Sequence, residues 1–162
     1  MLLIAVLVLS CPGQLPAQVT AFAGTRKYTV EVDTLGITTP VPVGGDSAWA
    51  LLPGIYESLG LPLDEHDARV KRLGTCWKRV RSRLGGSQLS RYLDCGELRQ
   101  MPNADAYDVD VLVLTAVRQE NGSPVIATIV LGWANAPGGG RQWCQSRGAL
   151  EKRILDAVGK SP

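Results

Sequence analysis

Histidine is nearly absent from this sequence of 162 residues, in which His66 is the only one. A metal site built from several histidines is therefore excluded, and at most one imidazole is available as a general base. The sequence also lacks a Cys-x-x-Cys pair, a catalytic serine elbow, an H-E-x-x-H motif, a phosphate-binding loop and a dinucleotide-binding glycine motif. We therefore expect no metal ion and no cofactor.

A large excess of charge is lacking as well. The 17 lysines and arginines and the 15 acidic residues give a formal net charge of +2, which by itself does not indicate a nucleic-acid partner. Hydrophobic residues make up 45% of the chain and charged residues 20%. This composition is typical of one ordinary globular domain with a buried core.

An uninterrupted apolar run occupies residues 1–9 and is followed by Ser10, Cys11, Pro12 and Gly13. A membrane-spanning helix needs about twenty apolar residues, so this shorter run predicts the hydrophobic core of a secretory signal peptide. No lysine or arginine precedes the run, although signal peptides usually begin with one. A start codon further upstream would explain this departure.

Two processing routes are open for this segment. Ala17, Ala21 and Ala23 offer small residues for ordinary cleavage, and we expect this route, with residues 1–23 as the signal peptide. Alternatively, residues 8–11 resemble a lipobox, so that the signal ends at residue 10 and a lipidated Cys11 anchors an envelope protein. Both routes predict an exported protein, periplasmic or extracellular, in a compartment where thiols oxidise.

Three cysteines remain after either route, because Cys11 is removed or lipidated. We predict a disulfide between Cys95 and Cys144, since both lie near loops that flank the central hairpin described below. Cys76 falls within a strand pattern beside Trp77, where a small apolar side chain fits. We expect it to be free and buried.

The chain after the signal divides into an N-terminal strand with a proline- and glycine-rich connector (24–45) and an α+β domain (46–160). Alternation predicts a strand over 28–33, and the connector follows it. Asp46 is the expected N-cap of a helix that ends near Gly60, and Pro53 predicts a kink in it or a late start. A last helix is expected to open at Ser146 or Gly148.

A β-hairpin is the clearest local pattern. Asn121-Gly122 is the favoured two-residue turn, and it joins a strand over 107–118 to a strand over 125–133. The resulting register puts apolar pairs on both faces. We expect the helices to cover one face, and the N-terminal segment (28–43) or a partner such as a second copy to cover the other. This partner face consists of Leu112, Leu114, Ile129, Leu131 and Trp133.

Basic residues are concentrated over 69–84, which we interpret as two strands with a bend at Gly74. Arg79, Arg81 and Arg83 alternate, so they are predicted to project from one strand face. Three guanidinium groups there would bind phosphate, a carboxylate-rich glycan or an anionic lipid headgroup. The alternative is a solvated face that Asp94, Glu97 and helix acids neutralise.

An enzyme is the alternative function. His66 lies among acids at 64–67, a setting that would suit a general base, and Asp105, Asp108 and Asp110 would supply the paired carboxylates of a glycosidase. The simpler interpretation is a solvent-facing loop and the polar end of a strand. No nucleophile or orienting partner is identified for His66.

Three segments resemble an uncharacterised family of secreted bacterial proteins over most of the mature chain: Trp49-x-x-Leu52, Arg83-Leu-Gly-Gly86 and Leu89-Ser-Arg-Tyr-Leu-Asp-Cys-Gly96. The resemblance implies no activity. From the order of elements we predict an α+β fold with an antiparallel sheet and two helices on one face, similar to helix-grip domains of some envelope lipoproteins. The expected function is that of a secreted or envelope-associated binding or accessory domain.

Overall fold

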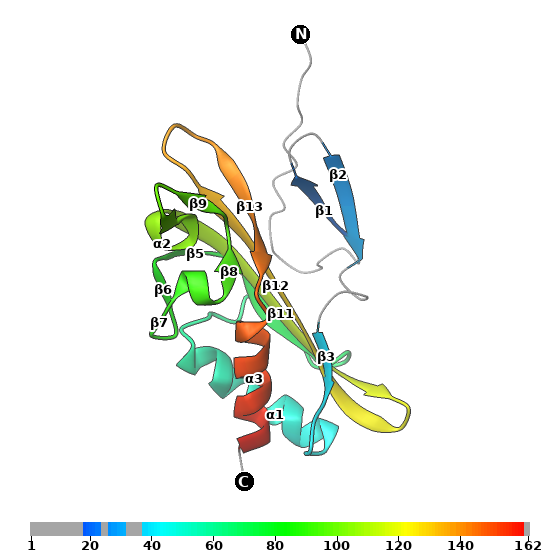
Figure 1. The fold of residues 1–162 in the computed structure, drawn as a ribbon. Helices are drawn as coiled ribbons and strands as arrows, with labels where there is room; N and C mark the ends of the chain where they lie inside the picture. The colour runs from blue at the N-terminus through cyan, green and yellow to red at the C-terminus, as the bar shows by residue number, and fades with distance from the viewer. Residues whose placement is uncertain (1–17, 24–25, 32–36, 161–162) are drawn as a thin grey trace.

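A computed structural model describes residues 18–23, 26–31 and 37–160 of the protein (Figure 1). The strands are β1 (Gln18–Ala23), β2 (Arg26–Glu31), β3 (Ile37–Pro40), β4 (Glu65–Asp67), β5 (Arg72–Arg81), β6 (Arg83–Leu84), β7 (Ser87–Gln88), β8 (Leu93–Asp94), β9 (Glu97–Leu98), β10 (Met101–Pro102), β11 (Asp108–Glu120), β12 (Ser123–Asn135) and β13 (Arg141–Ser146). The helices are α1 (Gly45–Ser58), the 3₁₀ turn η1 (Leu89–Arg91), α2 (Asn103–Ala106) and α3 (Ala149–Lys160).

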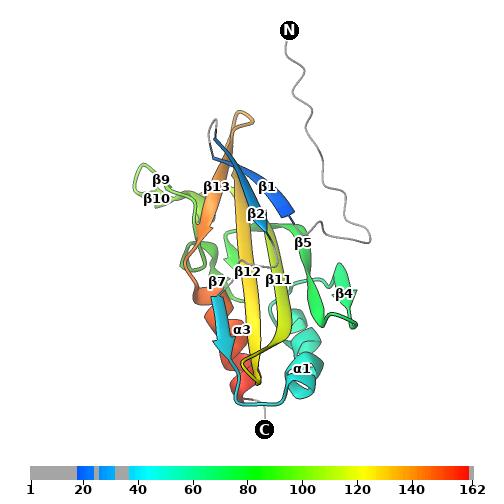
Figure 2. The same cartoon turned by 90° about the vertical axis from the view of Figure 1, so that its right-hand side faces the viewer.

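The main sheet is antiparallel, in the order β4-β5-β11-β12-β13-β8. Strand β3 also pairs with β12, so β3 and β13 lie along the same edge of β12, one near each end (Figure 2). Helices α1 and α3 contact each other and lie on one face of this sheet. The predicted α+β class, with both long helices on one face, is confirmed.

The β11–β12 hairpin forms the centre of the sheet and has the predicted register. Asn121 and Gly122 make its turn with φ of +52° and +78°, as a type I′ turn requires. Val117 pairs with Ile126, and Leu114 pairs with Ile129 on the opposite face. The turn alone therefore sets which side chains face the helices.

The core lies between the helices and one face of this hairpin. Its fully buried side chains include Leu52 and Tyr56 of α1 and Leu150 and Ile154 of α3. Tyr56 Oη lies 2.8 Å from Thr115 Oγ1, which is 3.1 Å from Thr128 Oγ1, so three buried hydroxyls form a chain of hydrogen bonds. Burial raises the pKa of Tyr56 well above its ordinary value, and its phenol stays neutral.

The opposite face of the hairpin is closed within the single chain. Leu112, Leu114 and Ile129 are only 1%, 2% and 7% exposed, and Trp77 and Leu131 pack against them. The β1–β2 pair lies on this side of the sheet in both views, and β1 contacts β13 (Figures 1 and 2). Three of the five residues of the predicted partner face are thus buried without a partner, while Leu131 and Trp133 are half-buried.

Two expectations about the N-terminal half are wrong. Asp46 is not the N-cap of α1: the helix begins at Gly45 after Gly44, and the Asp46 carboxylate accepts a 2.5 Å hydrogen bond from Lys71 Nζ. Of the two alternatives for Pro53, the late start is excluded, because the helix runs through Pro53 from its first turn, while the kink stays a prediction. In addition, part of the predicted connector forms strand β3, since an edge strand tolerates Pro40.

The bend expected at Gly74 is not there either, because β5 continues through it. A Cβ atom at Gly74 would lie 2.3 Å from Leu114 Cδ2 and 2.5 Å from the Val113 carbonyl oxygen, so glycine permits close strand contact. The irregularity comes later, where the register shifts and Trp77 adopts a φ of +39°. Further on, the strand predicted at 88–93 is instead mostly the turn η1 and β8.

The cysteine predictions are confirmed in one part and wrong in another. Cys95 and Cys144 form the predicted disulfide. Cys76, in contrast, is half-buried and disulfide-bonded, so it is not the free thiol we expected, and its bonding partner lies outside the described residues. The lipidation prediction for Cys11 also falls outside the described residues.

Candidate functional site

The predicted basic strip forms only in part. Arg79 and Arg81 project from the same face of β5, but each stands opposite an aspartate of β11. Arg79 Nε donates to Asp110 at 2.9 Å, and Arg81 Nη1 lies 3.4 Å from Asp108 Oδ1. The aspartates of the neighbouring strand therefore largely neutralise the positive charge of this face. The alternating arginines in the sequence do not reveal these partners.

Arg83 does not extend this strip. Ser82 interrupts the strand with a φ of +56°, and Arg83 belongs to the separate hairpin β6–β7, where its Nη1 donates to the Gly86 carbonyl at 2.9 Å. Asp94, proposed as a neutralising acid, pairs instead with Arg147 at 3.0 Å. The three guanidinium groups consequently do not share one surface.

Asp110 is the centre of the polar cluster on this face. Besides Arg79, it accepts hydrogen bonds from Asn135 Nδ2 at 3.1 Å and Arg141 Nη2 at 3.3 Å. Arg141 lies over the Trp133 ring. Burial alone would raise the pKa of Asp110, but the hydrogen bonds of Arg79 and Asn135 and the charges of both arginines hold it below its usual value.

We predict that Asp110→Asn destabilises the protein at neutral pH by about 1–2 kcal/mol, since charge-assisted hydrogen bonds are lost. A pKa that is lower in the folded state means that ionised Asp110 stabilises the fold above about pH 4, and that this stabilisation is lost as the pH falls further. Urea unfolding of wild type and variant at pH 7 and pH 3 measures the difference. An equal difference at both pH values would contradict this assignment.

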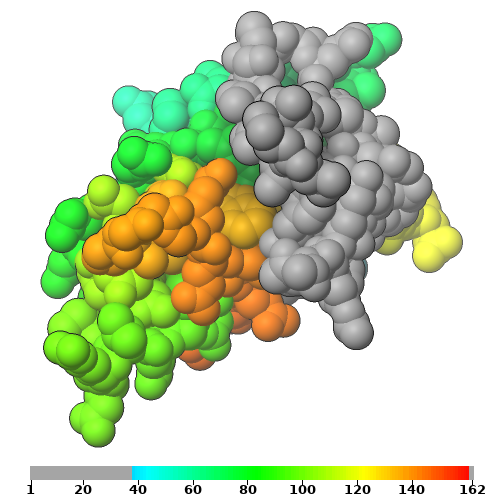
Figure 3. Space-filling model, turned by 90° about the horizontal axis from the view of Figure 1, so that it is seen from above, coloured from blue at the N-terminus to red at the C-terminus, as the bar shows by residue number. Residues whose placement is uncertain are grey.

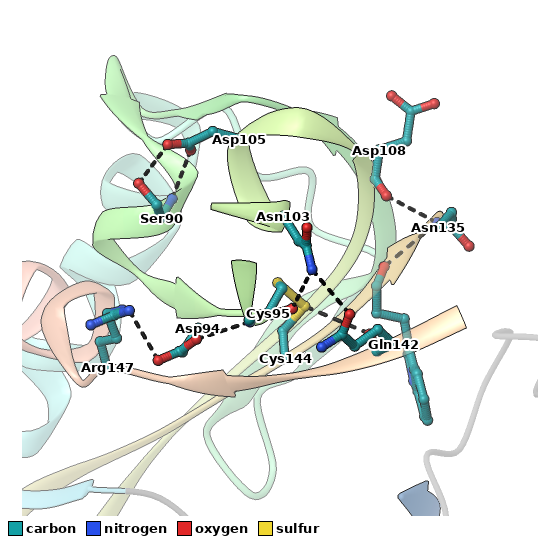
Figure 4. Close-up of a disulfide and its surroundings, with 12 residues drawn as sticks. Ser90, Asp94, Cys95, Asn103, Asp105, Asp108, Asn135, Gln142, Cys144 and Arg147 are labelled. Carbon is teal, nitrogen blue, oxygen red and sulfur yellow. Dashed lines mark hydrogen bonds and ion pairs between the residues drawn. A yellow bond between two sulfur atoms is a disulfide. The ribbon is translucent and has the colours of Figure 1, made fainter. Parts of the chain in front are cut away.

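The residues of the alternative enzyme do not converge. His66 stands opposite Leu73 on β5, which pairs with Thr115, so its ring lies on the helix side, 5.0 Å from the Trp49 ring. Asp108 and Asp110 project from the other face of the sheet. The carboxylate of the third acid, Asp105, accepts hydrogen bonds from the backbone N–H and the hydroxyl of Ser90, at 2.9 and 2.6 Å (Figure 4).

The disulfide joins β13 to the excursion that carries η1, β8, β9 and β10. Asn103 reinforces the junction: its Nδ2 donates to the Cys95 carbonyl and to Gln142 Oε1, both at 3.1 Å (Figure 4). Seen from above, the orange β13 region lies at the surface next to this green excursion (Figure 3). The disulfide and the Asn103–Gln142 hydrogen bond therefore attach the excursion to β13, while the Asn103–Cys95 hydrogen bond lies within the excursion.

A cavity of about 310 Å³ lies between α3 and the edge of the sheet. It adjoins the stretch of β12 between its pairing with β3, which ends at Thr128, and its pairing with β13, which begins at Gly132. Such a volume is within the range of small-molecule sites. Its lining comes from three elements and the residue before α3: Thr39, Ile126, Thr128, Gly148, Glu151, Lys152 and Leu155.

Glu151 is the distinctive residue of this cavity. It lies in the first turn of α3 and is only 6% exposed, although glutamate is rarely buried without a partner. Ser146 Oγ donates to Oε1 at 2.5 Å and in turn accepts from the Gly148 N–H, an arrangement that caps the helix. The other oxygen, Oε2, is buried, and no atom of the described residues forms a hydrogen bond with it.

Sequence reasoning missed this site. The predicted apolar stripe of the last helix consists of Leu150, Ile154, Ala157 and Val158; Ala157 is only half-buried, the other three are fully buried, and Glu151 stands beside the stripe. The spacing of Gly148 and Glu151 resembles a capping box, and a structural role in the helix start fully accounts for that pattern. Only the position of β3 shows that Glu151 belongs to the lining of a cavity.

The described residues contain no group of three or more histidine, cysteine or acidic side chains that would hold a metal ion. None of the described helices combines the length and the apolar composition needed to cross a membrane. In comparisons with known proteins, neither a protein-family model nor a curated protein matches the sequence.

Proposed function

We propose that this protein is an exported binding domain that takes a small ligand in the cavity between α3, β3 and β12. The observation that carries the proposal is the cavity itself, which combines polar and apolar lining residues, among them the buried Glu151. The cavity around it has the size of a ligand site.

Export is supported by the disulfide between Cys95 and Cys144, since such bonds persist in oxidising compartments. The apolar run at residues 1–9 suits a signal peptide. The cleavage position affects the fold, because β1 pairs with β2 over its whole length and ends at Ala23. Cleavage after Ala17, or lipidation of Cys11, would retain β1, while cleavage after Ala23 would remove it.

Binding accounts for the geometry better than catalysis does. His66 and the strand aspartates lie on opposite faces of the sheet, so no constellation of nucleophile, base and acid forms from them. Anion binding through Arg79 and Arg81 remains a proposal, but their aspartate partners and the separate position of Arg83 weaken it. An accessory role in the envelope is compatible with a bound ligand.

Filling the cavity tests the proposal. We expect Thr39→Trp, on the cavity side of β3, to abolish retention of a native ligand, because the indole would occupy the binding volume. Native mass spectrometry of protein purified from the exporting cell measures the extra mass. Thr38→Trp is the matched control. Thr38 is exposed, and as the neighbour of Thr39 on the strand it points to the opposite face of the sheet, away from the cavity. Equal ligand retention by both variants would contradict the assigned site.

A further inference from the structure

A strained turn joins the short strands β9 and β10. Its central residues, Arg99 and Gln100, have φ of +51° and +65°, both positive as in the Asn121-Gly122 turn. Asparagine and glycine adopt positive φ readily, whereas arginine and glutamine do so at a steric cost. Backbone preference therefore does not account for the residues of this turn, and strain of this kind is found at functional sites.

An apolar pair flanks the turn. Leu98 and Met101 stand opposite each other in the hairpin, so their side chains lie on the same face of it. They are 56% and 55% exposed, more than any other large hydrophobic side chain of the described residues. The β9–β10 hairpin projects away from the main sheet (Figure 2). Residues 98–101, the hairpin tip, thus form a convex apolar surface.

The base of the hairpin is fixed to the sheet. Cys95, two residues before β9, is bonded to Cys144 of β13. Directly after β10, the Asn103 N–H donates to the Gly96 carbonyl at 2.9 Å, and Asn103 Nδ2 donates to the Cys95 carbonyl. The fold therefore presents the two exposed aliphatic side chains on an anchored support.

The charge of the tip is positive. Arg99 is exposed and lies between the two aliphatic residues, while Gln100 is uncharged. The nearest acid in sequence, Glu97, is adjacent to Leu98 on β9 and so points to the opposite face of the hairpin. Aliphatic side chains beside a guanidinium complement a bilayer surface, where the former enter the acyl boundary and the latter stays at the phosphates.

Size and shape distinguish this partner from others. A tip of four residues is too small for a stable protein interface, which buries about 800 Å² on each side. A convex tip is also unlike the concave sites of small molecules. We propose that the hairpin tip is a membrane-contact site, at which Leu98 and Met101 insert into an anionic lipid surface and Arg99 binds lipid phosphate. The site is separate from the cavity beside α3.

Co-sedimentation of protein from the exporting cell with phosphatidylcholine vesicles, with and without phosphatidylglycerol, tests the proposal. We expect the wild type to bind best with phosphatidylglycerol, and less as salt rises. Leu98→Ser/Met101→Ser should weaken binding at least about tenfold, since two aliphatic side chains are lost. Arg99→Gln should weaken binding to the anionic vesicles about fivefold, the effect of one charge at such a surface.

Two further variants serve as controls with the same N-terminus. Val70 is also an exposed aliphatic residue, but it lies between β4 and β5, at the opposite edge of the sheet from β8, so Val70→Ser should bind like the wild type. Arg99→Asn/Gln100→Gly restores the favoured turn residues. It should raise the urea midpoint of unfolding and yet weaken binding about fivefold, a combination that a purely structural role of the turn does not produce.

A wild type that stays in the supernatant with both kinds of vesicle overturns the inference. So does a folded Leu98→Ser/Met101→Ser variant that binds as tightly as the wild type, or a Val70→Ser variant that loses as much binding. Photo-crosslinking from position 99 in the exporting cell that gives a protein adduct and no lipid adduct would assign the tip to a protein partner instead. None of these outcomes affects the proposed ligand cavity, which the Thr39→Trp variant tests.

Discussion

Replacing Leu114 with lysine is expected to destabilise the isolated monomer by about 3–5 kcal/mol, a large fraction of the stability of an ordinary domain. Leu114 is 2% exposed and packs with Leu112 and Ile129 on the sheet face away from the helices. The substitution removes that packing and also buries an ammonium among apolar neighbours, which is costly for an unpaired charge. Because this face is covered within the chain, we expect the substitution to impair folding.

Urea unfolding followed by circular dichroism measures this loss, with Glu120→Lys as the control. Glu120 belongs to the same strand and the same face but is exposed, so its substitution should leave stability nearly unchanged. A Leu114→Lys variant that stays a stable monomer but loses self-association would instead show that a second copy covers the face. Unchanged folding and assembly would show that the packing described for Leu114 is wrong.

Removing the Cys95–Cys144 disulfide should cost about 4 kcal/mol, because it closes a loop with a sequence separation of 49 residues. The double variant Cys95→Ala/Cys144→Ala measures this effect in urea unfolding. A reducing agent is unsuitable, since Cys76 is disulfide-bonded as well. As a control, Asn103→Ala removes the two hydrogen bonds beside the disulfide and should cost less, about 1–3 kcal/mol.

A loss below about 1 kcal/mol for the double variant would contradict the chain-entropy argument. It would mean that the η1 to β10 excursion stays near β13 in the unfolded chain without the covalent link. Peptide mapping under non-reducing conditions then verifies the pairing itself. Cys95 joined to any cysteine other than Cys144 would exclude the fold described around Asn103.

The parts of the fold that were predictable from sequence are those that short-range patterns determine. Asn121-Gly122 imposes a two-residue turn, and the turn fixes every pair of the hairpin down to Asp110 and Trp133. The stripe of Leu150, Ile154 and Val158 similarly locates α3. In both cases the information lies within the element itself.

The wrong predictions depend on neighbours that are distant in sequence. Asp46 would be a good N-cap by propensity, but Lys71 attracts its carboxylate. Gly74 is required by the side chain of Leu114, which only the strand order reveals. Arg79 and Arg81 form an alternating basic pattern, while their opposing aspartates become visible only when β5 is placed beside β11.

The candidate site could not be predicted for the same reason. Glu151 has an ordinary helix-capping role in the sequence, and the unpartnered oxygen is evident only from the folded arrangement. Its cavity has walls from β3, β12 and α3; β3 lies near the start of the described chain, whereas β12 and α3 lie towards its end. No short-range pattern in the sequence indicates that these three elements pack together.

The pairing of β3 with β12 has a consequence for the order of assembly. Thr39 is synthesised long before its partner Ile126, so β3 stays unpaired until the hairpin has been synthesised and has closed. Hairpins close within microseconds, whereas pairing across a long intervening chain is slower. The cavity is complete only when β3 and α3 have both packed against β12. A ligand held there would therefore bind fully folded molecules in preference to partly folded ones.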